Sequence, residues 1–87
     1  MNTTFTDKAF TQYTEWVDVD RKKFRKIGEL IKSIKRDGLL NGIGNPERLK
    51  WIDGYSREID QSNRLVYRVD ESGNLEIISC KGHYDDK

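Results

Sequence analysis

Residues 20–38 read DRKKFRKIGELIKSIKRDG. Apolar side chains recur in this stretch at intervals of three and four residues, which is the pattern of one face of an amphipathic helix. They are Phe24, Ile27, Leu30, Ile31 and Ile34. Asp20 stands where an N-cap residue belongs, and Gly38 follows the pattern as a C-terminal glycine does. The sequence therefore predicts a helix over residues 20–36 whose apolar face joins a core.

The predicted helix also concentrates the positive charge of the chain. Between Arg21 and Arg36 there are eight basic residues and one acid, Glu29, a net charge of +7. The other eight basic and fourteen acidic residues give −6, so the overall charge of +1 hides two opposite parts. Such a helix can follow the phosphates of a nucleic acid, although most charged helix faces are only solvated. The basic residues are Arg21, Lys22, Lys23, Arg25, Lys26, Lys32, Lys35 and Arg36.

The residues before this helix predict a shorter one. Thr6 or Asp7 can act as its N-cap, and residues 9–17 carry apolar side chains at helical spacing. These are Phe10, Tyr13 and Val17, with Ala9 and Trp16 beside them. Residues 18–20 form a short link, so we expect the two helices to form a hairpin. Residues 2–6 are a candidate for a short first strand.

After the second helix the sequence becomes typical of loops and strands. Residues 37–46 hold three of the seven glycines and the only proline, which predicts a loop. Strand-like runs follow at residues 49–52, 55–59, 64–69 and 75–81, and short, turn-rich links separate the last three. The predicted fold class is α+β, with two N-terminal helices packed on a mainly antiparallel sheet in a single domain of residues 1–87.

Composition excludes several classes of protein. The sequence has no apolar run near the ~20 residues of a membrane-spanning helix. Its N-terminus lacks the basic segment and apolar run of a secretory signal, so we expect a cytoplasmic protein. The single cysteine, Cys80, lies in an apolar run and predicts a buried structural thiol. We expect neither a metal site nor a cofactor.

Glu47, Arg64 and His83 are each typical of ordinary surface residues when they are taken alone. Together they supply what metal-free cleavage of RNA requires. This reaction requires a base that deprotonates the ribose 2′-hydroxyl, a cation that stabilises the charge on the phosphate and an acid that protonates the departing 5′-oxygen. With the basic helix they suggest a small ribonuclease, while the alternative of three unrelated surface residues stays open.

Three motifs give the sequence a family resemblance. GIGNPERLK at residues 42–50 resembles the G-x-G-x-P-E-x-L-K loop of the YoeB/Txe toxins. RLVYRV at residues 64–69 resembles their R-L-V-Y-x-V strand, and CKGHY at residues 80–84 resembles their C-x-x-H-Y terminus. The order of the motifs and the length of the chain agree as well. The YoeB/Txe toxins are ribosome-dependent mRNA interferases of the RelE superfamily.

The resemblance implies a compact RelE-like domain that cleaves mRNA in the ribosomal A site without a cofactor. It also implies neutralisation by a YefM-like antitoxin, toxin homodimers, and contact with operator DNA only through the toxin–antitoxin complex. By the matched positions, Glu47 is the implied general base, His83 the general acid and Arg64 the stabiliser of phosphate charge.

Further residues follow from the same resemblance. Tyr84 is implied as a fourth catalytic residue that orients the substrate. Lys50 and Arg57, with the basic helix, are implied to bind RNA or the ribosome. In an unbroken strand His83 and Tyr84 would face opposite ways. For both to reach one site, the chain must leave regular extension near Gly82, which glycine permits.

Four departures from the family pattern bear on the site. Glu58 stands where the family has the second arginine of its W-S-R-R-I segment, which places negative charge near a phosphate. Asn63 replaces the usual histidine before the R-L-V-Y motif, and Tyr55 stands alone where an aromatic pair is usual. Residues 85–87, DDK, extend past the usual terminal tyrosine. The acid at position 58 motivates an alternative, a catalytically weakened module that binds RNA or an antitoxin.

Overall fold

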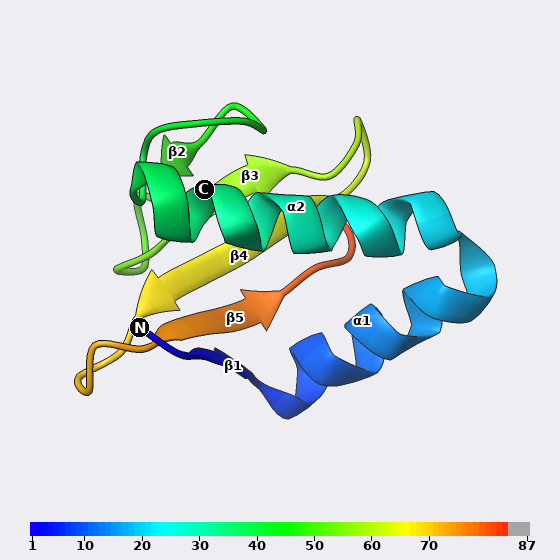
Figure 1. Ribbon diagram of the computed structural model, residues 1–87, viewed down its shortest axis with the longest axis horizontal. Coiled ribbons are helices and arrows are strands. Elements are labelled where there is room, and N and C mark those ends of the chain that lie inside the picture. The colour runs from blue at the N-terminus through cyan, green and yellow to red at the C-terminus, as the bar shows by residue number, and fades with distance from the viewer. Residues whose placement is uncertain (84–87) are drawn as a thin grey trace.

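Two helices and five strands make up the computed structural model, which describes residues 1–83 (Figure 1). In chain order they are β1 (Thr3–Phe5), α1 (Asp7–Val19), α2 (Arg21–Asp37), β2 (Glu47–Arg48), β3 (Tyr55–Glu58), β4 (Arg64–Val69) and β5 (Leu75–Ser79). The predicted α+β class and the predicted order of helices and strands are confirmed.

The five strands form one sheet in the order β1-β5-β4-β3-β2. β2 to β5 pair antiparallel along the chain, whereas β1 pairs with β5 in parallel. The pairing of β1 continues past its ends, because Leu75 N donates to Asn2 O at 2.8 Å and Thr6 N donates to Ile77 O at 3.0 Å. The sheet is therefore mainly antiparallel, as predicted, and its first strand lies beside its last.

The core lies between the two helices and one face of the sheet. Figure 1 shows α2 crossing the sheet, with α1 beside it toward β1 and β5. Ile27, Leu30 and Ile34 of α2 are at most 2% exposed, which confirms the predicted apolar face. They join a cluster with side chains from α1, the sheet and its flanking residues: Ala9, Trp16, Ile59, Leu65, Tyr67, Leu75, Ile77 and Cys80.

The two helices meet at a single residue, Asp20. Its backbone N–H donates to Trp16 O at 2.9 Å and ends α1, while its carboxylate accepts from Lys22 N at 3.0 Å and begins α2. Asp20 is thus the N-cap that the sequence predicts. For α1 the cap is Thr6 rather than Asp7, because the Thr6 hydroxyl accepts from Ala9 N at 3.0 Å.

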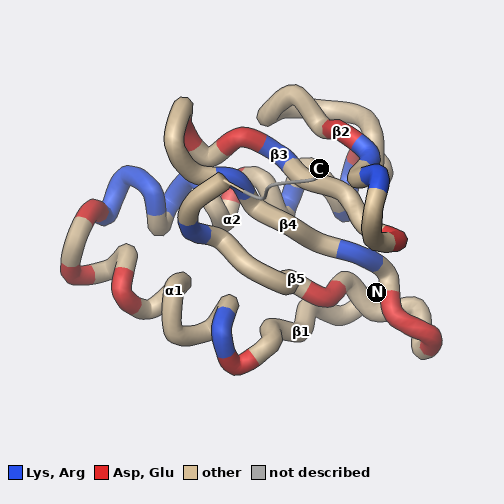
Figure 2. The backbone as a smooth tube through the Cα atoms, turned by 180° about the vertical axis from the view of Figure 1, so that it is seen from behind, with Lys and Arg blue, Asp and Glu red and all other residues tan. Residues whose placement is uncertain are grey.

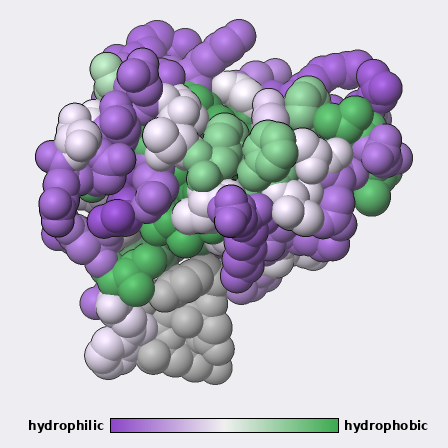
Figure 3. Space-filling model, turned by 90° about the horizontal axis from the view of Figure 1, so that it is seen from below, coloured by the Kyte–Doolittle hydropathy of each residue, from purple (hydrophilic) through white to green (hydrophobic). Residues whose placement is uncertain are grey.

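The predicted apolar face of α1 is only partly right. Ala9 and Trp16 are buried and Tyr13 packs against the core, but Phe10 is 57% exposed. Phe10 touches Phe5 edge to face instead, with ring centroids 6.5 Å apart. Figure 3, which views the molecule from the side of α1 and β1, shows hydrophobic side chains at this surface among hydrophilic ones. Within residues 1–83 no helix is long and apolar enough to cross a membrane.

The strand predicted at residues 49–52 is wrong. The pairing segment is β2, Glu47–Arg48, and the chain then turns, with Gly54 N donating to Ile52 O at 2.9 Å. Leu49 N donates to Gly54 O at 2.9 Å, and the Leu49 side chain is 8% exposed. These contacts fold residues 49–54 into a turn that leads into β3, and residues 49–52 do not form a strand.

The last strand ends earlier than the predicted residue 81. A bulge interrupts its pairing with β4, because Val66 pairs with Ser79 while Tyr67 pairs with Ile77. The extra residue changes the alternation, so Ile77 and Cys80 are both fully buried in the core. Gly82 then adopts a φ of +79°, which confirms that the chain leaves regular extension there. Tyr84 and residues 85–87 lie outside the described residues.

Candidate active site

Arg64 is the centre of the site, on the sheet face that is turned away from the helices. Its neighbour Leu65 points into the core, so alternation turns Arg64 to the opposite side of β4. The guanidinium is held from two directions. Nε donates to the Ser56 hydroxyl at 2.9 Å, and an Nη donates to Asn45 O at 3.4 Å. The Arg64 side chain is only 11% exposed, so most of it is buried.

Glu47 lies beside the Arg64 guanidinium. β2 pairs with β3 so that Glu47 stands opposite Ser56, the residue that holds Arg64. A Glu47 carboxylate oxygen is 3.8 Å from an Arg64 Nη, and the Glu47 side chain is 58% exposed. The structure therefore brings together two residues that are 17 positions apart in the sequence.

Glu58 approaches the same guanidinium from another side. It is paired with Arg64 in the register of β3 and β4, and its carboxylate is 3.6 Å from the other Nη. The Asn45 side-chain amide donates to that carboxylate at 3.2 Å. The acid that departs from the family pattern thus lies directly at the proposed phosphate-binding group, so two carboxylates flank Arg64.

The segment that carries His83 is tied to the start of β4. Arg64 N donates to Gly82 O at 3.0 Å, and Gly82 N donates to the Asn63 side-chain oxygen at 2.8 Å. The exposed His83 ring contacts the β3–β4 turn, with Nε2 2.8 Å from Gln61 O. Since a carbonyl only accepts hydrogen bonds, Nε2 carries a proton in this contact. The backbone before His83 thus reaches Arg64, while the imidazole rests on the turn.

Asn63 is a site residue whose role sequence reasoning missed. Its amide nitrogen donates to both carboxylate oxygens of Asp60, at 3.0 and 3.1 Å, while its oxygen holds Gly82. The sequence signals only the turn itself, since an Asp at its start typically accepts a hydrogen bond from the backbone two residues on, as Asp60 does from Ser62 N at 2.7 Å. Asn63 replaces the histidine that is usual in the family, and its side chain holds the segment that precedes His83.

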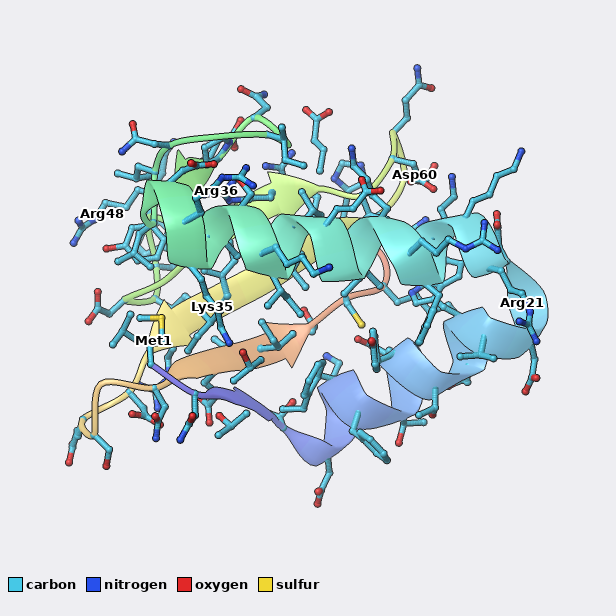
Figure 4. The ribbon with its side chains drawn as sticks, in the orientation of Figure 1. Met1, Arg21, Lys35, Arg36, Arg48 and Asp60 are labelled. Carbon is cyan, nitrogen blue, oxygen red and sulfur yellow. The ribbon has the colours of Figure 1, made fainter. Side chains whose placement is uncertain are left out.

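Asp60 fastens the same turn to α2. Its carboxylate lies 3.1 Å from the Lys23 ammonium, and Figure 4 shows Asp60 in the β3–β4 turn, next to α2. Burial acts to raise the pKa of Asp60, but hydrogen bonds from Ser62 N, Lys23 and Asn63 outweigh it and lower the pKa to about 2. Lys23 is therefore partly engaged within the protein.

Arg57 is not on the surface that would meet RNA, which corrects its assignment as an RNA-binding residue. Its exposure is 0%, and all five of its hydrogen bonds go to neutral oxygen atoms. The acceptors are the Tyr67 and Ser33 hydroxyls, both at 2.9 Å, and the carbonyls of Ile43 at 2.9 Å, Gly38 at 2.7 Å and Asn41 at 2.6 Å. Arg57 thus fixes the glycine loop between α2 and β2 from inside the protein.

The glycines of this loop serve close packing. Gly42 has a φ of +102°, and a Cβ there would lie 2.6 Å from an Asp37 carboxylate oxygen. Gly44 has a φ of +88°, and a Cβ there would lie 2.6 Å from a methyl carbon of Leu30. Gly44 O also accepts from Glu58 N at 2.7 Å, which attaches the loop to β3. The loop therefore holds Glu47 at Arg64 because it is pinned to α2, Arg57 and β3.

The basic residues of α2 lie on the other side of the sheet from Arg64, because α2 packs on the core face. Figure 4 shows Arg21 at one end of α2 and Lys35 and Arg36 at the other, so the basic surface runs along the helix. Figure 2 shows this run of basic residues beginning next to the acidic residues of the α1–α2 link. The members that are exposed are Arg21, Lys22, Arg25, Lys32, Lys35 and Arg36, whereas Lys23 and Lys26 are half-buried.

Lys50 is exposed just after β2. Cys80 is fully buried, as predicted, and burial raises the pKa of its thiol to about 12. Within residues 1–83 no group of three or more His, Cys, Asp or Glu side chains could hold a metal ion.

Comparison with known proteins points to one family. The sequence model of the YoeB-like toxins of bacterial type II toxin–antitoxin systems matches residues 5–84. Toxin YoeB of Streptomyces coelicolor is 41% identical over 86 residues, which cover 97% of this chain and 100% of the relative. Toxin YoeB of Escherichia coli K12 is 36% identical over 86 residues, with the same coverage.

Solved structures agree with the sequence comparison. The YoeB dimer from Staphylococcus aureus superposes with a TM-score of 0.89 at 48% identity, and the heterotetrameric YoeB–YefM complex from the same organism with 0.87 at 48% identity. Both alignments cover 97% of this chain and 98% of the solved chain. YafQ from E. coli shares the fold alone, with a TM-score of 0.75 at 12% identity over 94% of this chain and 92% of the other.

Proposed function

Because this chain belongs to the YoeB-like toxins of bacterial type II toxin–antitoxin systems, we propose that it is an endoribonuclease that inhibits translation by cleaving mRNA in the ribosomal A site. The observation that carries the proposal is the meeting of Glu47 with Arg64 at 3.8 Å. The segment that leads to His83 is bound to the Arg64 backbone.

The proposed reaction is an attack of the ribose 2′-oxygen on the adjacent phosphorus. Glu47 accepts the proton of the 2′-hydroxyl as the new P–O bond forms. Arg64 stabilises the negative charge that builds up on the phosphate oxygens. His83 donates the Nε2 proton to the departing 5′-oxygen as the old P–O bond breaks. The products are a 2′,3′-cyclic phosphate and a 5′-hydroxyl, and Tyr84 is proposed to orient the substrate.

The proposed RNA surface has two separate parts. Arg64 meets the scissile mRNA, together with Lys50, which follows Glu47 by three residues. The basic residues of α2 lie on the opposite layer and meet a different stretch of RNA. A single short strand cannot touch both sides of the sheet at once, whereas ribosomal RNA can surround a small protein. The arrangement therefore favours the ribosome over free mRNA as the platform for cleavage, and it predicts binding that weakens with salt.

The partners proposed for this chain follow those of its relatives. YoeB is found as a dimer and in a heterotetrameric complex with YefM in the S. aureus structures. We propose that this chain forms a homodimer and is neutralised by a YefM-like antitoxin. The complex would reach operator DNA only through the antitoxin, and the proposed location is the cytoplasm.

A second candidate function has its own observation. Glu58 lies 3.6 Å from Arg64, where a negative charge opposes phosphate binding. A protein with this arrangement could bind RNA or an antitoxin without appreciable cleavage. Ribosome binding without any mRNA cut distinguishes this function from the proposed one.

The test is cleavage of a defined mRNA on purified ribosomes, read by primer extension, with the toxin freed of antitoxin. The wild type is expected to cut in the A-site codon, and Glu47→Gln and His83→Gln are expected to lose most of this activity. Glu71→Gln is the matched control, since Glu71 lies exposed in the β4–β5 turn, away from Arg64. Full cleavage by both site variants would refute the assigned roles, and no cleavage by the wild type would refute the proposed activity.

A further inference from the structure

We propose that Glu58 is an internal competitor for phosphate, whose carboxylate occupies the place on Arg64 that an RNA phosphate must take. The inference rests on the proposed function for its biological meaning. It concerns a single exchange, in which Arg64 releases Glu58 as it binds a phosphate oxygen. The consequence is a lower affinity for RNA and a weaker dependence of that affinity on salt than Arg64 alone would give.

Each nitrogen of the Arg64 guanidinium already faces a neighbouring group of the protein. Nε is committed to the Ser56 hydroxyl at 2.9 Å, and one Nη faces Asn45 O and Glu47. The other Nη faces Glu58 at 3.6 Å. This last distance is longer than a hydrogen bond between charged groups, which is about 2.7–2.9 Å. A phosphate oxygen can therefore replace Glu58 with a closer contact, but only after the carboxylate has moved.

The Glu58 carboxylate is held in this place. Its residue is opposite Arg64 in the β3–β4 register, and Glu58 N is bound to Gly44 O at 2.7 Å. The Asn45 amide then donates to the carboxylate at 3.2 Å. Asn45 has a φ of +51°, a left-handed conformation that Asn tolerates better than most residues. A fixed backbone and a hydrogen-bond donor thus keep the negative charge at Arg64 when no RNA is bound.

Exchange of one anion for another has a thermodynamic signature. Cations condense on the phosphates of RNA, and a protein cation that neutralises a phosphate releases them, so affinity falls with salt. An arginine whose charge is already balanced by a carboxylate neutralises a phosphate less completely, so fewer cations leave the RNA. Removal of the Glu58 charge should therefore tighten RNA binding and also make it more sensitive to salt, a pair of changes that a purely structural role would not produce.

The experiment measures binding of a short single-stranded RNA with 2′-O-methyl riboses, which cannot be cleaved by 2′-hydroxyl attack. Wild type, Glu58→Gln and Glu76→Gln are titrated at several salt concentrations. Glu76 is a matched control because it pairs with Arg68 at 2.7 Å on the same sheet face as Arg64. Its removal changes the net charge by the same amount without freeing Arg64.

The expected result is binding about fivefold tighter for Glu58→Gln at low salt, which corresponds to ~1 kcal/mol between charges about 4 Å apart in water. The slope of log affinity against log salt should steepen by about 0.7, the value for one additional contact with a single strand. Glu76→Gln should match the wild type in slope. Glu58→Ala repeats the test without an amide and should change affinity and slope in the same direction.

Two results would overturn the inference. One is equal affinity and slope for Glu58→Gln and the wild type. The other is an equal rise for Glu58→Gln and Glu76→Gln, since overall charge, or release of any arginine on this face, would then explain the effect. Cleavage on ribosomes separates this failure from failure of the proposed function. If the wild type cleaves mRNA but Glu58→Gln does not change RNA affinity, only the inference about Glu58 is refuted. If Glu58→Gln changes RNA affinity but the wild type does not cleave, only the proposed activity is refuted.

Discussion

Arg57 donates a hydrogen bond from Nε to the hydroxyl of Tyr67 at 2.9 Å, and that hydroxyl donates in turn to Leu39 O at 2.6 Å. The two side chains come from neighbouring strands and are both fully buried, with the guanidinium 5.8 Å from the Tyr67 ring centroid. Together they connect the sheet to the loop that follows α2. The loop that leads to Glu47 therefore depends on a buried cation.

Arg57→Lys should destabilise the protein by about 2–4 kcal/mol, because a lysine ammonium cannot satisfy the five oxygen atoms that Arg57 now satisfies. Urea unfolding followed by circular dichroism measures the change. Arg48→Lys is the control, since the Arg48 side chain is 65% exposed, and its cost should stay below about 0.5 kcal/mol. Equal stability of the two variants would contradict the anchoring role.

Gly42→Ala should destabilise the protein more than Gly73→Ala. Both glycines have positive φ, so both substitutions carry a backbone cost of about 1–2 kcal/mol. A Cβ at Gly42 also meets Asp37 at 2.6 Å, whereas a Cβ at Gly73 has no atom within 4 Å. The difference in unfolding free energy isolates the packing of the loop against α2. If both variants unfold alike in urea, the loop is not tightly packed.

Protonation of Asp60 should weaken the fold in acid. The folded-state pKa is about 2, below the usual value of 3.8, so the carboxylate contributes stability that is fully present above pH 4. This stability, about 1–2 kcal/mol, is lost as the pH falls toward 2. Urea unfolding from pH 5 to pH 2 checks the loss, and Asp60→Asn should flatten part of the dependence. Asp53→Asn is the matched control, because it also removes one carboxylate and the Asp53 side chain is 89% exposed.

Cys80 should resist thiol reagents while the protein is folded. Burial raises its pKa to about 12 from the usual 9.0, so its thiolate fraction at neutral pH falls roughly a thousandfold. Reaction with a disulfide reagent should be slow in buffer and fast in concentrated urea. Since Cys80 is the only cysteine, the signal has a single source. Equal rates in buffer and urea would show that the thiol is accessible.

The sequence predicts best those elements whose own residues determine them. α2 has an apolar face, an N-cap and a terminal glycine within one stretch, and the structure places it within one residue of the predicted bounds. β4 alternates clearly and has the predicted bounds. In both elements local pattern and tertiary packing agree, which is why a single sequence was sufficient.

Predictions failed where distant residues decide the structure. Residues 49–52 are apolar enough for a strand, but a turn that closes on Gly54 removes their pairing. The bulge opposite Val66 arises from the pairing of two strands, and the sequence pattern of β5 does not predict it. Arg57 looked like a surface cation because its five acceptors lie on α2, the glycine loop and β4, where only the folded chain assembles them.

The pairing of β1 with β5 determines when the sheet can be completed during synthesis of the chain. Thr3 pairs with Leu75, so the first strand has no place in the sheet until the last strand exists. On the synthesising ribosome, α1 and α2 emerge long before the strand that they must cover. Contacts of such large sequence separation form late and slowly. Newly made chains therefore pass through an interval without a finished sheet, which ends only after β5 has been synthesised.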